Sequence, residues 1–118
     1  MSDWKEQLRK ANVDVDGAIK RFINKEDRYI KYLKLFADSQ DLHNLNVALE
    51  RNEVEVAFDF CHTIKGVSGN LGFMTLYEET SKACDILRVG KMDGVKELID
   101  KLTPNYQIIV SIIRENLL

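Results

Sequence analysis

One histidine carries the clearest chemical potential in this 118-residue sequence. Lys65, Gly66 and Gly69 follow His62 at spacings of three, four and seven residues, which bring side chains to one face of a helix. An exposed imidazole can accept a phosphoryl group on nitrogen, and the Lys65 ammonium can neutralise an anion attached to the ring. These residue types therefore suit transient phosphorylation of His62.

The glycines beside His62 give a second indication. Each glycine within a helix costs about 1 kcal/mol relative to alanine, so two glycines on one surface patch need a reason. We interpret Gly66 and Gly69 as removing side chains so that another molecule can approach the imidazole. The alternative is that they let a neighbouring helix pack closely, and it applies more to Gly69 than to Gly66. Gly72 is expected to serve the turn after the helix.

A helical wheel indicates that His62 faces solvent. The helix is predicted from about Glu53 to about Asn70, and successive residues turn by about 100°. With His62 at 0°, the main apolar residues of this stretch fall at about 140° to 220°: Ala57, Phe60, Ile64, Val67 and Leu71. Cys61 and Ser68 fall at the border of that stripe. The predicted core therefore lies opposite the histidine.

Three further residues on the His62 side are candidates for contact with a partner. Phe58 and Phe73 are large apolar residues where a water-facing surface usually carries polar ones, and Asp59 lies beside them. Exposed apolar residues of this kind often mark protein–protein interfaces. We therefore predict a docking patch made by Phe58, Asp59 and Phe73 together with the two glycines.

No other group of residues suggests catalysis or metal binding. His43 lacks comparable neighbours and is interpreted as an ordinary exposed side chain. Cys61 and Cys84 fit no zinc spacing with the histidines and are expected to be reduced thiols. Cys61 lies about 100° around the helix from His62, so no metal site is expected there. The sequence also lacks the glycine-rich loops of P-loop and Rossmann proteins, which argues against an autonomous kinase.

The hydrophobic periodicity predicts mainly helical structure. Asp14 or Asp16 is expected to cap the second, short helix, with Ile19, Phe22 and Ile23 on its apolar face. The other helices are predicted at about residues 2–11, 26–37, 42–51, 53–70, 75–89 and 92–118.

Turn-forming residues separate these segments. Asn52 is a plausible left-handed stop, and Gly90 is typical of the position after a helix. Pro104 lies inside the last periodic segment, where proline lacks an N–H and clashes with the preceding turn. We favour one kinked helix there over a new helix capped by Thr103.

Composition supports an all-α fold. The chain has one proline and six glycines, with 45% hydrophobic and 31% charged residues, which is ordinary for a globular domain. We predict a single domain over residues 1–118, an antiparallel four-helix bundle at about 25–118 with short capping helices at about 1–24. The formal charge of −2 argues against nucleic-acid binding. No apolar run is long enough to span a bilayer and no signal peptide is recognised, so a cytoplasmic protein is expected. Nothing in the patterning indicates a dimer, so a monomer is expected.

Residues 62–72, HTIKGVSGNLG, resemble the signature of histidine-containing phosphotransfer (HPt) domains, usually written H-x-[LI]-K-G-x-[SA]-x-x-[LI]-G. This core is specific because a histidine, a lysine and the glycines must all fall in register. The resemblance extends over about residues 13–90, and the final helix fits only by pattern. Phe73 departs from the family, in which a small residue is frequent at this position, and it bears on partner specificity.

The resemblance implies a four-helix bundle with a solvent-facing histidine in the middle of one helix. His62 would accept a phosphoryl group from the aspartyl phosphate of a receiver domain and pass it to the aspartate of another receiver. Lys65 would screen the phosphate charge, and Gly66 and Gly69 would admit the receiver's loops. The implied partners are response-regulator receivers and a hybrid sensor histidine kinase. The chain would be a phosphocarrier and no enzyme, without a cofactor of its own, because Mg²⁺ belongs to the receiver in this family.

A second function remains open on the sequence alone. A helical interaction module could bind receiver or kinase domains without carrying phosphate. The variant His62→Gln separates the two hypotheses, because it would abolish phosphorylation in a phosphocarrier and leave binding unchanged in a pure interaction module.

Overall fold

The computed structural model describes residues 3–118, and seven α-helices account for most of that range. They are α1 Trp4–Lys10, α2 Val15–Arg21, α3 Glu26–Asp38, α4 Asp41–Glu50, α5 Val54–Leu71, α6 Met74–Arg88 and α7 Val95–Leu117. The all-α prediction is confirmed, and the predicted helices agree with these bounds to within a few residues.

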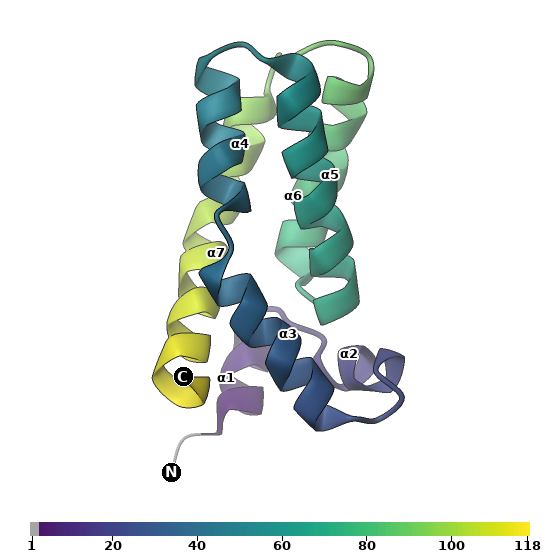
Figure 1. Cartoon of the computed structure of the whole chain (residues 1–118), viewed down its shortest axis with the longest axis vertical. Coiled ribbons are helices and arrows are strands. Elements are labelled where there is room, and N and C mark those ends of the chain that lie inside the picture. Colours follow the sequence, from purple (N-terminus) through teal and green to yellow (C-terminus); the bar gives the residue numbers. More distant parts are fainter. Residues whose placement is uncertain (1–2) are drawn as a thin grey trace.

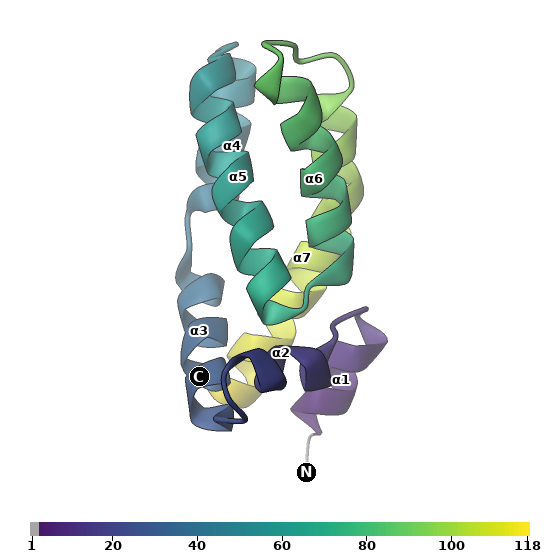
Figure 2. The same ribbon diagram turned by 90° about the vertical axis from the view of Figure 1, so that its right-hand side faces the viewer.

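The long helices form an antiparallel bundle (Figure 1). α4, α5, α6 and α7 run alternately up and down, and α5 packs between α4 and α6. α3 lies below α4 in the same column, and it packs against α7 and α5. The short helices α1 and α2 cover the lower end of the bundle, against α7 and α5 (Figure 2). The predicted bundle with N-terminal capping helices is therefore present.

Periodic apolar residues build the core. In α7 the fully buried residues recur at helical spacing, which is why this segment packs along its whole length: Val95, Ile99, Leu102, Ile109 and Ile113. Burial of each large apolar side chain contributes about 1.5–3 kcal/mol. Tyr29 is also completely buried, and its hydroxyl donates a hydrogen bond to the Leu71 carbonyl oxygen at 2.9 Å. This bond joins α3 to the C-terminal end of α5.

Helix ends follow local chemistry. Asp14, one of the two candidate caps, accepts a hydrogen bond from the Gly17 backbone N–H at 3.1 Å and begins α2. Asn52 has a φ of 56° after α4, as expected for a left-handed stop. The placement of Ile23 on the apolar face of α2 is wrong, because Ile23 follows the helix with a φ of 57° and is 74% exposed.

One continuous helix passes through Pro104. The favoured prediction of a single helix is confirmed, and the alternative of a new start at Thr103 is not. The Thr103 hydroxyl instead donates to the Ile99 carbonyl oxygen at 2.7 Å, within the same helix. Such a bond to the preceding turn is a common use of threonine inside helices.

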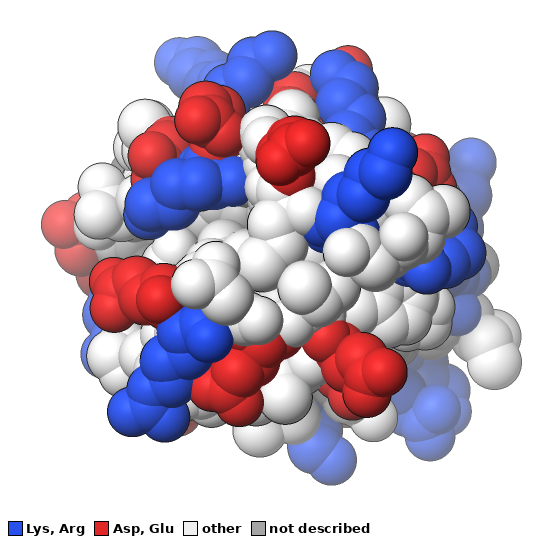
Figure 3. Space-filling model, turned by 90° about the horizontal axis from the view of Figure 1, so that it is seen from above, with Lys and Arg blue, Asp and Glu red and all other residues white. Residues whose placement is uncertain are grey.

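Charges of both signs are mixed on the end of the molecule formed by the α4–α5 and α6–α7 connections (Figure 3). Lysine and arginine side chains alternate there with aspartate and glutamate around an uncharged centre. This view agrees with the near-balance of charge in the sequence. Within residues 3–118, no helix is both long and apolar enough to cross a membrane.

Candidate functional site

His62 lies near the middle of α5, and its side chain is exposed. The buried residues of the helix lie on the opposite side: Ala57, Cys61, Ile64, Ser68 and Leu71. The predicted orientation of His62 is confirmed. The core stripe is rotated slightly from the prediction, because Cys61 and Ser68 are fully buried while Phe60 and Val67 are only half-buried. No residue within 3–118 forms a hydrogen bond with the imidazole in this structure.

Gly66 leaves open space one turn after His62. A Cβ atom placed on Gly66 would have no other atom within 4 Å apart from its own helix backbone and chain neighbours. The surface beside the imidazole is therefore bare on this side. The backbone of another protein could come closer here than any side chain would allow.

Gly69 has different surroundings. A Cβ atom on Gly69 would lie 3.1 Å from Cε1 and 3.2 Å from Cδ1 of the Tyr77 ring, which extends from α6. The Tyr77 ring thus already occupies the space beside Gly69. This contact favours the alternative of close packing for Gly69, whereas Gly66 leaves the surface open.

Lys65 is half-buried and also contacts Tyr77. Its Nζ atom lies 5.9 Å from the centre of the Tyr77 ring, within the range of a cation–π interaction. Lys65 forms no ion pair with a residue in 3–118. The ammonium is therefore available to an incoming anion while the tyrosine ring restricts where it lies. This arrangement places a positive charge on the α6 side of His62.

Phe58 precedes His62 by four residues, so it lies one turn towards the N-terminal end of α5. The two rings are 5.6 Å apart between centroids and inclined by 32°. The Arg88 guanidinium carbon lies 5.6 Å from the centre of the Phe58 ring, and Arg88 also pairs with Asp85 at 3.0 Å. Phe58 is consequently half-buried and flanked by a cation. Asp59 is exposed beside it, as expected, and its backbone carbonyl accepts a hydrogen bond from Thr63 Oγ1 at 3.0 Å.

Phe73 does not belong to this surface. The prediction that it contributes to an exposed docking patch is wrong, because Phe73 is fully buried and its ring packs edge-on against Phe36 at 4.7 Å. The reason is the geometry of the helix end. The Phe73 N–H bonds to the Ser68 carbonyl oxygen at 2.9 Å, as in a Schellman motif, in which the residue after the glycine turns back towards the helix.

Gly72 produces that turn, as the sequence predicts. Its φ is 83°, and a Cβ atom there would lie 2.5 Å from the Asp14 carbonyl oxygen. The Gly72 carbonyl oxygen accepts a bond from the Asp14 N–H at 2.8 Å. Both the left-handed backbone and the contact with the N-terminal segment therefore require glycine.

The two cysteines lie in the core between α5 and α6 and are free thiols. A hydrogen bond with Cys84, together with burial, raises the pKa of the Cys61 thiol. Neutral, buried thiols are poor nucleophiles and poor metal ligands. Cys61 therefore acts as a small core residue, although it is adjacent to His62 in sequence.

The sequence interpretation missed Tyr77 and Arg88 as neighbours of the site. Both follow from the tight turn between α5 and α6, which brings residues at equal distances from the turn to the same level. Gly69 and Tyr77 each lie four residues from Phe73, and Phe58 and Arg88 each lie fifteen. Counting outward from the predicted turn could therefore have found both residues.

Two comparisons with known proteins gave a match. A family model described as the Hpt domain matches residues 32–114. A solved structure, described as the HPT domain from the Hpt sensor hybrid histidine kinase from Shewanella, is similar with a TM-score of 0.79 and 18% sequence identity. The match covers 91% of this chain and 94% of that domain, and at this identity it shows a shared fold. No curated protein sequence matches the chain.

Proposed function

The chain belongs to the Hpt domain family, whose members act as histidine phosphocarriers in phosphorelays, and we propose that His62 is the residue that carries the phosphoryl group. The observation that carries this proposal is the exposed imidazole in the middle of α5, with bare surface at Gly66 and a lysine cation at Lys65. His43, the other histidine, is also exposed, but it lies on α4 without these neighbours.

The proposed reaction is a reversible transfer between aspartate and histidine. A lone pair on an imidazole nitrogen of His62 attacks the phosphorus of an aspartyl phosphate on a receiver domain. The N–P bond forms as the P–O bond to the donor aspartate breaks, and the carboxylate leaves. In the second transfer, a carboxylate oxygen of another receiver attacks, the N–P bond breaks, and the lone pair returns to the imidazole.

The roles of the surrounding residues follow from what such a transfer needs. Phosphoryl transfer depends on in-line positioning and on neutralisation of charge more than on an activated protein nucleophile. The Lys65 ammonium would neutralise part of the phosphate charge, and Gly66 would admit the receiver's loops. Phe58 and Asp59 would contact the receiver at the edge of the approach. We propose no cofactor on this chain, because the Mg²⁺ of the transfer would belong to the receiver.

The partners that fit this chemistry are response-regulator receiver domains and a hybrid sensor histidine kinase. We propose that the chain meets them in the cytoplasm as a monomer, and that residues 1–118 form a single domain in which about 1–24 cap the bundle of about 25–118. This arrangement leaves the His62 face free for one receiver at a time.

A phosphotransfer assay tests the proposal. Receivers carrying labelled aspartyl phosphate are mixed with the wild type, with His62→Gln and with the matched control His43→Gln. The wild type and His43→Gln should acquire an acid-labile, base-stable label, and His62→Gln should acquire none. Labelling of His62→Gln to the wild-type level would refute the assignment. Binding of receivers with no labelling of any protein would instead favour an interaction module that carries no phosphate.

A further inference from the structure

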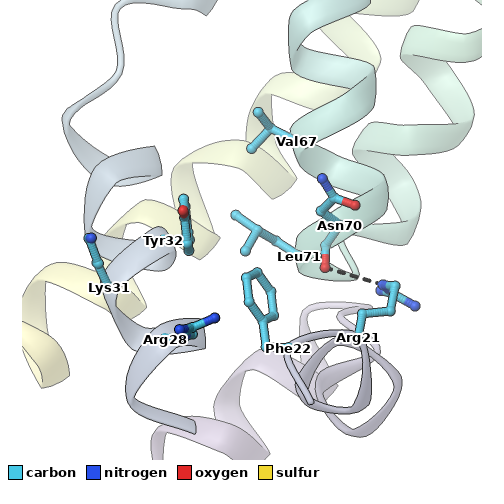
Figure 4. Close-up of a pocket in the computed structure, with 8 residues that line it drawn as sticks. All are labelled: Arg21, Phe22, Arg28, Lys31, Tyr32, Val67, Asn70 and Leu71. Carbon is cyan, nitrogen blue, oxygen red and sulfur yellow. Dashed lines mark hydrogen bonds between the residues drawn. The ribbon is translucent and has the colours of Figure 1, made fainter. Parts of the chain in front are cut away.

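A cationic cleft lies between α2, α3 and the C-terminal part of α5, and neither Lys65 nor Tyr77 lines it (Figure 4). Its volume is about 710 Å³, which is within the range of small-molecule sites. Arg21, Arg28 and Lys31 line it, and Arg21 and Arg28 lie on opposite sides of the Phe22 ring. Three cations around one cleft indicate an affinity for anions.

These cations form no ion pair within residues 3–118, whereas two nearby carboxylates, those of Glu26 and Asp16, are paired. Glu26 binds Lys5 at 2.7 Å, and Asp16 binds Arg9 at 3.0 Å. Arg21 donates from Nε to the Asn70 carbonyl oxygen at 3.3 Å, which fixes its side chain at the rim of the cleft. The terminal nitrogens of Arg21 remain free to bind a carboxylate or phosphate.

An apolar cavity lies next to the cationic cleft. It has a volume of about 310 Å³ and lies between α3, α4 and α5. Tyr32, Val67 and Leu71 line both spaces, so the two lie side by side. The remaining lining of the second cavity is mostly apolar, and it includes Leu35, which is 55% exposed, and the core residue Phe36. A ligand in the cleft could therefore bury a hydrocarbon chain beside its charged end.

We propose that the two spaces form one site for a small amphiphilic anion, with a phosphate or carboxylate head at Arg21, Arg28 and Lys31 and an aliphatic chain in the apolar cavity. The charge on the rim selects a negative head, and the apolar lining selects a hydrophobic body. This inference is independent of the function proposed for His62.

The aromatic residues of the cleft argue against a nucleotide base as the hydrophobic part. Phe22 and Tyr32 stack on each other with centroids 5.4 Å apart and an angle of 28°. Lys31 Nζ lies 5.9 Å from the Tyr32 ring centre. The two rings thus stack on each other, and a lysine lies beside the Tyr32 ring. They therefore do not offer two free ring faces between which a base could stack. A flexible chain, in contrast, needs only the apolar cavity.

The site also contacts the helix that carries His62. Val67 and Asn70 follow His62 by five and eight residues, which correspond to about 7.5 Å and 12 Å along the helix axis. A bound amphiphile would therefore lie on the neighbouring face of α5. It would be positioned to alter how a protein partner approaches this helix.

Binding measurements on the full chain test the proposal. Decyl phosphate and decanoate supply both parts of the ligand, whereas inorganic phosphate supplies only the head and decanol only the chain. We expect decyl phosphate, decanoate or both to bind in isothermal titration calorimetry, below the concentration of micelle formation, at least tenfold more tightly than either single part. The comparison of the two amphiphiles identifies the preferred head. Failure of both to bind would overturn the proposal.

Variants locate the binding site. Arg28→Gln with Lys31→Gln removes two exposed cations and should weaken binding about tenfold or more. The control Lys34→Gln removes an exposed charge of the same helix that does not line the cleft, and it should bind as the wild type does. Amide chemical shifts should change at Leu35 and Val67. Equal binding by all variants, or shifts confined to other surfaces, would overturn the proposal. A further outcome would also overturn the proposal: no amphiphile binds the wild type, and the double variant fails to bind a protein partner that the wild type binds. The cleft would then be a protein interface.

Discussion

Gly66 lowers the stability of α5 at the surface next to His62. Because a Cβ atom there meets no neighbour, Gly66→Ala should gain the full helix propensity of alanine, about 1 kcal/mol in the free energy of unfolding. Urea denaturation measures this gain. If Gly66 opens the surface for a receiver, the same variant should transfer phosphate more slowly while being more stable.

Gly69→Ala is the matched comparison within the same helix. Its new Cβ atom would lie 3.1 Å from Tyr77 Cε1, so the ring must shift before the alanine fits. The stability gain should therefore be smaller than that of Gly66→Ala, or absent. Equal gains at both positions would contradict the tight contact with Tyr77.

Tyr77 is expected to position Lys65. A cation–π contact at an exposed site contributes about 0.5–1 kcal/mol, so Tyr77→Leu should slow phosphotransfer to His62 about two- to fivefold. The residue would act through Lys65, and a double-mutant cycle checks this. In a Lys65→Ala background, Tyr77→Leu should have no further effect on the rate. Additive effects would show that the ring influences the reaction in another way.

The contrast between His62 and Phe73 shows what periodicity reveals about single residues. His62, Gly66 and the core stripe belong to one helix, so a wheel places them relative to one another. Phe73 lies beyond the helix end, where the left-handed Gly72 redirects the chain and invalidates the wheel. The Tyr77 contact depends on how α6 packs back along α5. The periodicity of α5 alone carries no information about that packing.

At the scale of elements, Gly72 joins α5, α6 and the N-terminal segment. Gly72→Ala combines a left-handed backbone with a Cβ contact of 2.5 Å to the Asp14 carbonyl oxygen. We expect a loss of about 2–5 kcal/mol in the free energy of unfolding. Gly90→Ala is the control, because its φ of 79° is similar but a Cβ atom there meets nothing within 4 Å. It should lose only about 1–2 kcal/mol. Equal losses would mean that the contact with Asp14 contributes nothing.

Helix boundaries were predictable where a residue's own backbone preference decides them. Asn52, Gly72 and Gly90 all have positive φ values at the ends of predicted helices, as their residue types suggest. Ile23 has a positive φ as well, which is unfavourable for a β-branched residue, and nothing in the structure explains isoleucine at this position. The boundary of α2 therefore could not be read from residue preference.

At the scale of the whole molecule, the N-terminal third of the chain binds the last turn of the helix that carries His62. Tyr29 Oη donates a hydrogen bond to the Leu71 carbonyl oxygen. The Asp14 N–H donates to the Gly72 carbonyl oxygen, and Arg21 Nε donates to the Asn70 carbonyl oxygen. Carbonyl groups at a helix end have no partner within the helix, so these bonds satisfy them. Long-range bonds of this kind leave no periodic signal, which is why the capping helices could be predicted but not their attachment to α5.

Tyr29 makes this attachment sensitive to alkaline pH. Burial raises the pKa of its hydroxyl above the ordinary value of 10.0. Below pH 10 the hydroxyl is protonated in both states and its stabilising contribution is complete. As the pH rises above 10, the unfolded chain releases the proton while the folded protein retains it, so the free energy of unfolding should fall by up to about 1.4 kcal/mol per pH unit. Burial also raises the pKa of Tyr106, which adds to this decrease.

Tyr29→Phe separates the two contributions of this residue. At neutral pH the variant should be about 1 kcal/mol less stable, because the Leu71 carbonyl oxygen loses its donor. Above pH 10 its stability should fall less steeply than that of the wild type, so the two curves converge. Urea denaturation between pH 7 and about pH 11 measures both, and Tyr32→Phe, at a 46% exposed residue, serves as the control. Parallel curves for the wild type and Tyr29→Phe would show that Tyr29 does not retain its proton. In that case the alkaline sensitivity of the bundle would have to arise elsewhere, with Tyr106→Phe as the next variant to measure.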